Sequence, residues 1–151
     1  MGARGRFARG AWALLSCSLV LILAPTPGAA ASGKVTLEVI VAQLSSEPGS
    51  IDPGAARLHK ELKDQFRYTS ISVLSKKRFE LSLDDVGRHE LPTGRTVMLK
   101  PIVIDGASAL ISVDVTGLIQ TDLRLENDQL VIIGAESHQG GKLVIAILIH
   151  L

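Results

Sequence analysis

The sequence predicts a mainly β domain of the α+β type: an antiparallel sheet or β-sandwich of about seven to eight strands, with one amphipathic helix packed on it. Three observations predict this class. Apolar and polar residues alternate over much of the chain, as in strands that bury one face. One stretch, at 53–66, repeats its apolar residues every four positions, as a helix does. Pairs of turn-forming residues separate the alternating stretches.

The first two elements are a strand and the helix. Alternation predicts a strand at 34–44. After a loop rich in Ser, Gly and Pro, Asp52 and Pro53 favour a helix start, because the carboxylate can accept hydrogen bonds from free backbone N–H groups and proline needs no N–H there. We therefore expect a helix at 53–66 that lays an apolar stripe on the sheet. The stripe consists of Leu58, Leu62 and Phe66.

Every later segment is predicted to be a strand. Two strands, at 68–74 and 78–83, are expected on either side of a turn at 75–77. Beyond them, pairs such as Asp105–Gly106 accommodate the positive φ angles of tight hairpins. Five further strands are expected between such pairs, at 95–104, 108–116, 118–126, 129–134 and 142–150.

Two of these strands carry a further signal. Pro101 interrupts one of them and cannot donate a ladder hydrogen bond, so we expect it at a sheet edge or a β-bulge. The last strand is apolar at every position from Leu143 to Ile149, which predicts that it is covered on both faces.

Residues 1–31 have the three parts of a secretory signal peptide: arginines, an apolar stretch at 11–24, and small residues before the expected cleavage after Ala31. The remaining residues, 32–151, are expected to form a single β-rich domain in the periplasm or outside the cell. A spanning helix needs about 20 apolar residues, and this run is shorter and is closed by Pro25, so we expect no stable membrane anchor after cleavage.

Two alternatives to simple export stay open: retention by an uncleaved signal anchor, and lipid attachment at Cys17. Lipidation is the less favoured, because the strongly apolar run at 19–23 follows Cys17 instead of preceding it. Cys17 is the only cysteine, so the exported domain can form no disulfide of its own and its stability must come from packing.

The charge of the chain argues against a nucleic-acid partner. The sequence has 16 basic and 15 acidic residues, and three of the arginines lie within the signal peptide. The exported part is therefore slightly acidic, whereas nucleic-acid binding usually needs a clustered basic face.

The densest polar cluster lies at 84–90, where Asp84, Asp85, His89 and Glu90 could share a divalent ion. Their spacing fits neither the ligand pattern of zinc sites nor the oxygen-rich loops of calcium sites. A solvated hairpin connection is the favoured interpretation, and we expect no bound metal or cofactor.

The segment 133–143 resembles a phosphate-binding loop, because a Gly–Lys pair follows a strand. The glycine spacing is too long, Leu143 replaces the hydroxyl that would hold magnesium, and a strand follows where a helix is required. We therefore expect a hairpin loop and no nucleotide. His138 is a further candidate because Ser137 precedes it, but chain neighbours point differently and a catalytic triad needs a base placed by folding.

Several short runs resemble a group of small exported bacterial proteins of unassigned function. The runs are 62–70 (LKDQFRYTS), Leu74–Ser75, 91–95 (LPTGR) and 140–147 (GGKLVIAI). They cover most of the exported part but consist of turn glycines, strand apolars and a helix end. The resemblance implies a fold and a source with a two-membrane envelope, and it assigns no functional residue.

Three hypotheses for function follow. The favoured one is a non-enzymatic module that binds another cell-envelope protein through its loops or an exposed strand edge, with the Pro101 strand as the candidate edge. The alternative is an envelope hydrolase or metal-dependent enzyme, which requires the 84–90 and 134–141 loops to meet at one end of the sheet. A second alternative is a structural subunit that self-assembles through its strands.

Overall fold

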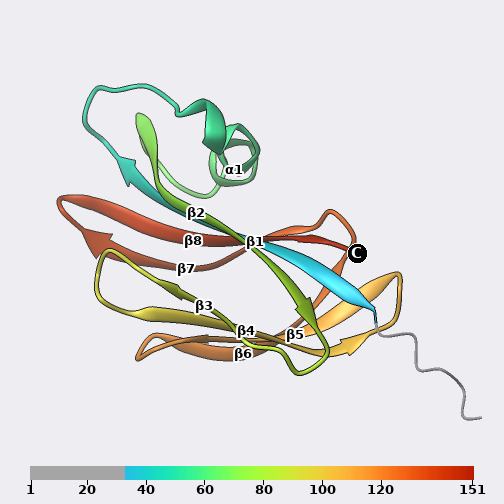
Figure 1. Cartoon of the computed structure of the whole chain (residues 1–151). Coiled ribbons are helices and arrows are strands. Elements are labelled where there is room, and N and C mark those ends of the chain that lie inside the picture. The colour runs from blue at the N-terminus through green and yellow to red at the C-terminus, as the bar shows by residue number, and fades with distance from the viewer. Residues whose placement is uncertain (1–32) are drawn as a thin grey trace, which may run out of the picture.

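In a computed structural model, residues 33–151 are described, and the expected signal peptide with Cys17 lies outside them. The mainly β fold is confirmed: eight strands form two antiparallel sheets, and one short helical segment packs on the first sheet (Figure 1). The strands are β1 (Lys34–Ser45), β2 (Ser70–Ser82), β3 (Gly87–Glu90), β4 (Thr96–Ile104), β5 (Ser108–Val115), β6 (Ile119–Glu126), β7 (Leu130–His138) and β8 (Gly141–His150). The helical segment is the 3-10 turn η1 (Pro53–Ala55) followed by α1 (Ala56–Leu62).

The two sheets have the strand orders β2-β1-β8-β7 and β3-β4-β5-β6 and lie face to face (Figure 1). Strands that follow one another in the chain pair with each other except at two places, where the chain crosses between the sheets. We call these places the β2–β3 seam and the β6–β7 seam. The pairing of β8 with β1 makes the first sheet continuous. The two sheets together therefore resemble a flattened barrel that is open at the β2–β3 seam and at the β6–β7 seam.

The sequence pattern of β8 is explained by its position. Leu143, Ile145 and Ile147 point between the two sheets and belong to the main core. Val144 and Ala146 point to the opposite face and form a second core under α1. The prediction that the last strand is covered on both faces is therefore confirmed. The fully apolar sequence of this strand follows from contact with two cores.

The helix begins where the sequence predicts and ends earlier. The Asp52 carboxylate accepts a hydrogen bond from the Gly54 N–H at 2.8 Å, as expected of a cap. The predicted helix 53–66 is too long, because α1 ends at Leu62 and the chain must return to the sheet by Ser70, where β2 starts beside β1. Phe66 still packs against the second core, from the connecting segment.

The predicted turn at 75–77 is wrong, because β2 runs without interruption from Ser70 to Ser82. Its polar middle is held in the sheet by Glu38 of β1, whose carboxylate lies 2.9 Å from the Lys76 ammonium and 3.9 Å from the Arg78 guanidinium. A β-bulge at Leu74 shifts the pairing with β1 by one residue. Apolar residues before the bulge therefore face the helix, and those after it face the second sheet.

Two predicted loops are shorter than expected. Residues 87–90 form the strand β3, so only the start of the 84–90 cluster is a turn. In the 134–141 segment, β7 continues to His138 and only Gln139 and Gly140 form the turn, with φ angles of 45° and 78°. Period-2 alternation is hard to recognise in both places, because short polar strands look like loops.

The prediction for Pro101 is half right. It lies at a β-bulge in β4, as one of the two expected placements. However, β4 pairs with both β3 and β5, so it is not the edge strand that we expected. The edges of the described sheets are β2, β7, β3 and β6. Within residues 33–151, no helix is long and apolar enough to cross a membrane.

Candidate functional site

The backbone edge of β7 is a place where another chain could pair with the described fold. Among residues 33–151, β7 pairs with β8 on one side and with no strand on the other. Its sequence, LVIIGAESH, contains no proline, lysine or arginine, and Glu136 is its only carboxylate. An edge without such residues is open to pairing with another strand.

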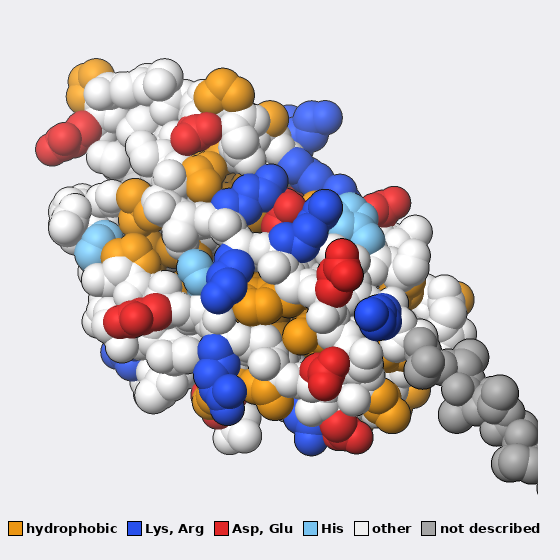
Figure 2. Space-filling view, viewed as in Figure 1, with side chains coloured by type: hydrophobic (Ala, Val, Ile, Leu, Met, Phe, Trp, Pro, Cys, Tyr) orange, Lys and Arg blue, Asp and Glu red, His pale blue; other side chains and the backbone are white. Residues whose placement is uncertain are grey.

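Each of the other three edges is protected. Basic side chains gather along β2 (Figure 2), where Lys76, Lys77 and Arg78 follow one another beyond the bulge. β3 has only four residues. β6 carries exposed charged side chains at Asp122, Arg124 and Glu126. Charges and short length are usual means of discouraging strand pairing, and of these β7 has only Glu136, so its main protection is a β-bulge at Ile133.

The backbone of β7 presents groups that can bind a new strand. His138 pairs with Gly141 across a two-residue turn, and such a flanking pair is joined by ladder hydrogen bonds. Because hydrogen-bonded and open pairs alternate in an antiparallel ladder, the N–H and C=O groups of Ser137 and Ala135 point away from β8. These groups are available to an added strand.

Contacts across the β6–β7 seam hold β7 against the second sheet. Leu118, in the turn before β6, lies 3.2 Å from the place where a side chain of Gly134 would begin. Arg95 Nε lies 3.2 Å from Glu136 Oε2, and Arg95 also donates to the Thr116 carbonyl at 2.8 Å. The only carboxylate of β7 is therefore turned inward, and its other oxygen, Oε1, is buried without a hydrogen-bond partner.

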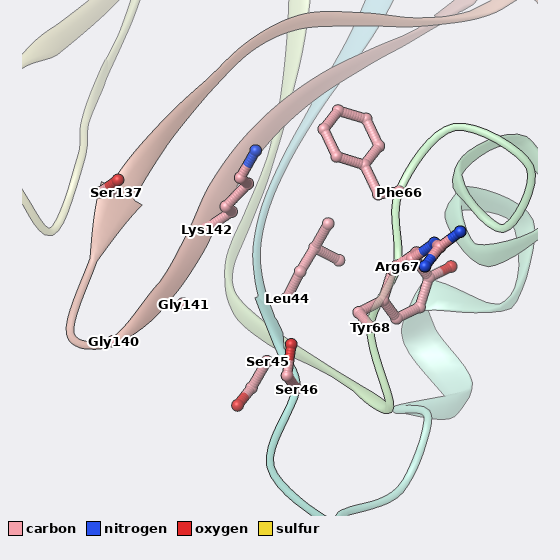
Figure 3. A pocket seen from close by; sticks show the side chains of 10 residues that line it. All are labelled: Leu44, Ser45, Ser46, Phe66, Arg67, Tyr68, Ser137, Gly140, Gly141 and Lys142. Atoms are coloured by element: carbon pink, nitrogen blue, oxygen red, sulfur yellow. The ribbon is translucent and has the colours of Figure 1, made fainter.

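An open hollow of about 260 Å³ lies at the hairpin end of β7 and β8 (Figure 3). Leu44 is at its base, and the Lys142 ammonium lies 5.4 Å from the centre of the Phe66 ring at its wall. Arg67 is at the rim, and Figure 3 shows its side chain directed away from Lys142. The two cations do not converge on one point, so this hollow is not a preformed anion site.

The predicted cluster at 84–90 is spread along the β2–β3 seam. Asp84 lies at the start of the turn, with its carboxylate 2.9 Å from the Lys100 ammonium. Asp85 accepts a hydrogen bond from the Ser82 N–H at 2.9 Å and so stabilises the same turn. Glu90 is exposed at the far end of β3. These contacts are structural.

His89 links the two sheets across the β2–β3 seam. Its Nε2 lies 2.8 Å from Ser75 Oγ on β2. Burial, and then the nearby Lys77 charge, lower the pKa of His89 below its usual 6.5, so the ring is neutral at neutral pH. A serine hydroxyl beside a neutral imidazole is a possible nucleophile and base, but catalysis also needs an orienting carboxylate and oxyanion donors. The contacts of His89 in the described residues show neither.

His138 lies far from that cluster. It ends β7 at the hairpin, and its carbonyl accepts a hydrogen bond from the Gln43 amide at 3.2 Å. Asp84 and Asp85 follow the end of β2, which pairs with the start of β1 at Lys34, whereas the hairpin lies beside the end of β1 at Leu44. The two predicted loops thus begin at opposite ends of the first sheet. Within the described part of the chain, no three His, Cys, Asp or Glu side chains gather as a metal site would require.

No pattern in the sequence points directly to the β7 edge. The strand was predicted, but its position at the end of a sheet depends on the pairing of β8 with β1, which are the last and first strands of the described fold. Comparison with protein families, curated proteins and solved structures finds no match for this chain.

Proposed function

We propose that this chain is an exported, non-enzymatic binding module that accepts an extended segment of another cell-envelope protein along the β7 edge. The observation that supports the proposal is the edge of β7, which has no strand partner on one side among residues 33–151 and carries no cation, beside three protected edges. An added strand would gain main-chain hydrogen bonds, which provide affinity without a preformed pocket.

The side chains around the edge define what kind of segment fits. Leu130 and Ile132 contribute to the core on the helix side, and Val131 contributes to the core between the sheets. All three are partly buried and lie next to the place of an added strand. A segment with apolar residues on both faces would extend the two cores and bury this surface, at about 25 cal/mol for each Å² of apolar area.

The two alternatives are less well supported. A hydrolase or metal-dependent enzyme would use Asp84, Asp85, His89, Glu90 or His138, and no observation brings these side chains to one place. Self-assembly through strands would use the same β7 edge, so the experiment must identify the bound chain.

The test is photo-crosslinking in native cells. A benzophenone amino acid replaces Ser137 on the β7 edge, and in a matched control it replaces Gln120 on the β6 edge, since both side chains are exposed. We expect a crosslinked product at Ser137 that contains one defined envelope protein, joined through one extended segment, and little product at Gln120. Equal products at both positions, no product, or products that contain only this chain would contradict the proposal.

A further inference from the structure

The outward groups of β7 have an arrangement that suits a second copy of the same strand. A β-bulge interrupts β7 at Ile133, and downstream of it the outward groups belong to Ala135 and Ser137. Upstream, the Ile149 N–H donates to the carbonyl of Gln129 at 3.2 Å, which sets the alternation for the first part of the strand. By that alternation, the backbone groups of Leu130 and Ile132 point outward.

The bulge makes this arrangement symmetric. The ladder with β8 pairs Ile132 with Ala146 and Gly134 with Ile145, so Ile133 is the extra residue. Outward groups therefore occur at two positions on each side of the bulge, with equal spacing within each pair. In an antiparallel arrangement about a two-fold axis, Leu130 of one copy meets Ser137 of the other, and Ile132 meets Ala135.

We infer that, before it meets its partner, the chain forms a two-fold homodimer in which the two β7 edges pair with each other. This inference rests on the proposed function of β7, and it adds how the edge is regulated. Pairing would join the two β7-containing sheets into one continuous sheet and protect an edge that is otherwise prone to aggregation. A partner segment must then displace the second copy, so the dimer and the partner complex compete.

Apolar residues lie where the two-fold axis would pass. Leu118 contacts the position of Gly134 at the centre of β7 and is 40% exposed. Its neighbour Ile119 is 37% exposed. Two-fold pairing would bring the Leu118 and Ile119 side chains of both copies to the middle of the interface. Well-packed residues at the centre of an interface, where water is excluded, usually contribute most to affinity.

The charges at the two ends of β7 are complementary under the same symmetry. At the start of the strand, the Asp128 carboxylate is exposed and lies 2.7 Å from His150 Nδ1. At the other end, Lys142 pairs across the ladder with Ser137 and has no carboxylate within ion-pair distance among the described residues. Antiparallel pairing places the Asp128 end of one copy at the Lys142 end of the other, which favours this orientation over a parallel one.

Cysteine pairs test the register directly. In a background with Cys17→Ser, the double variant Leu130→Cys, Ser137→Cys places a thiol of one copy opposite a thiol of the other. The Cα atoms of a hydrogen-bonded pair are about 5.5 Å apart, which permits a disulfide. Each single variant is the matched control, because identical residues would then be about 23 Å apart. We expect a disulfide-linked dimer from the double variant and none from the single variants.

A second variant and a measurement of mass complete the test. Leu118→Lys places a charge at the axis on an exposed position, and we expect its dimer to dissociate at least about tenfold more readily in analytical ultracentrifugation. A monomeric exported protein with no disulfide in the double variant would overturn the inference. If crosslinking at Ser137 still captures another protein, the proposed function survives that result. Dimers without any captured protein would support the dimer and contradict the proposed function.

Discussion

The close approach of the β7–β8 hairpin to β1 depends on Gly141. A side chain at this position would overlap the carbonyl oxygen of Leu44 on β1. That oxygen belongs to the backbone, so it cannot move away alone, and the two strands must separate. We therefore expect Gly141→Ala to destabilise the fold and displace the hairpin that carries the end of β7.

The size of the effect follows from the ladder. Separation would break hydrogen bonds where Leu44 pairs with Lys142 and where Ala42 pairs with Val144, the two nearest hydrogen-bonded pairs of the ladder. Two to four lost bonds, at about 1 kcal/mol each, give a loss of about 2–4 kcal/mol. With a urea m-value of about 1.5–2 kcal/mol/M, the unfolding midpoint should fall by about 1–3 M.

The matched control is the neighbouring glycine. Gly140 has a φ of 78°, and a side chain there would meet nothing within 4 Å. Gly140→Ala should therefore cost only the left-handed backbone conformation, about 1–2 kcal/mol. Urea unfolding followed by circular dichroism measures both variants. A Gly141→Ala midpoint equal to or above that of Gly140→Ala would refute the close-approach argument.

Three further predictions concern other contacts. Burial, and then Lys77, lower the pKa of His89, so as pH falls through 6.5 the unfolded chain takes up a proton before the folded chain does. The urea midpoint should therefore drop between about pH 7 and pH 5, and His89→Gln should reduce this drop. Leu58→Ala in α1 removes a fully buried side chain and should cost about 2–5 kcal/mol in urea unfolding, while crosslinking at Ser137 persists at low temperature. Glu38→Ala removes the carboxylate between two cations of β2 and should cost about 1 kcal/mol, less at high salt, since those cations are half exposed.

Much of the fold follows from local sequence patterns. The tight turns are predictable because Gly94, Gly106 and Gly140 adopt positive φ angles that other residues avoid. The cover on both faces of β8 is predictable because every residue from Leu143 to Ile149 is apolar. In both cases the cause lies within the segment itself.

The errors have causes that lie far away in the chain. Three polar residues at 75–77 resemble a turn, and they stay in a strand because Glu38, on the neighbouring strand, binds Lys76. Pro101 marks a bulge, but the order of strands decides whether its strand is an edge. The position of β7 at a sheet edge is hard to predict for the same reason, because it depends on which strands pair and not on the residues of β7 itself.

The most direct test of the central claim removes one outward N–H group from β7. Ser137→Pro deletes an N–H that points away from β8 and should leave the fold intact, whereas Ser137→Ala removes the same hydroxyl but keeps that N–H. Both variants are first shown to unfold at the same urea concentration, and each is then used to capture the Ser137-crosslinked protein from envelope extract. We predict that Ser137→Ala retains capture and that Ser137→Pro reduces it about tenfold or more. Equal capture by the two variants would show that the partner does not bind as an added strand on β7.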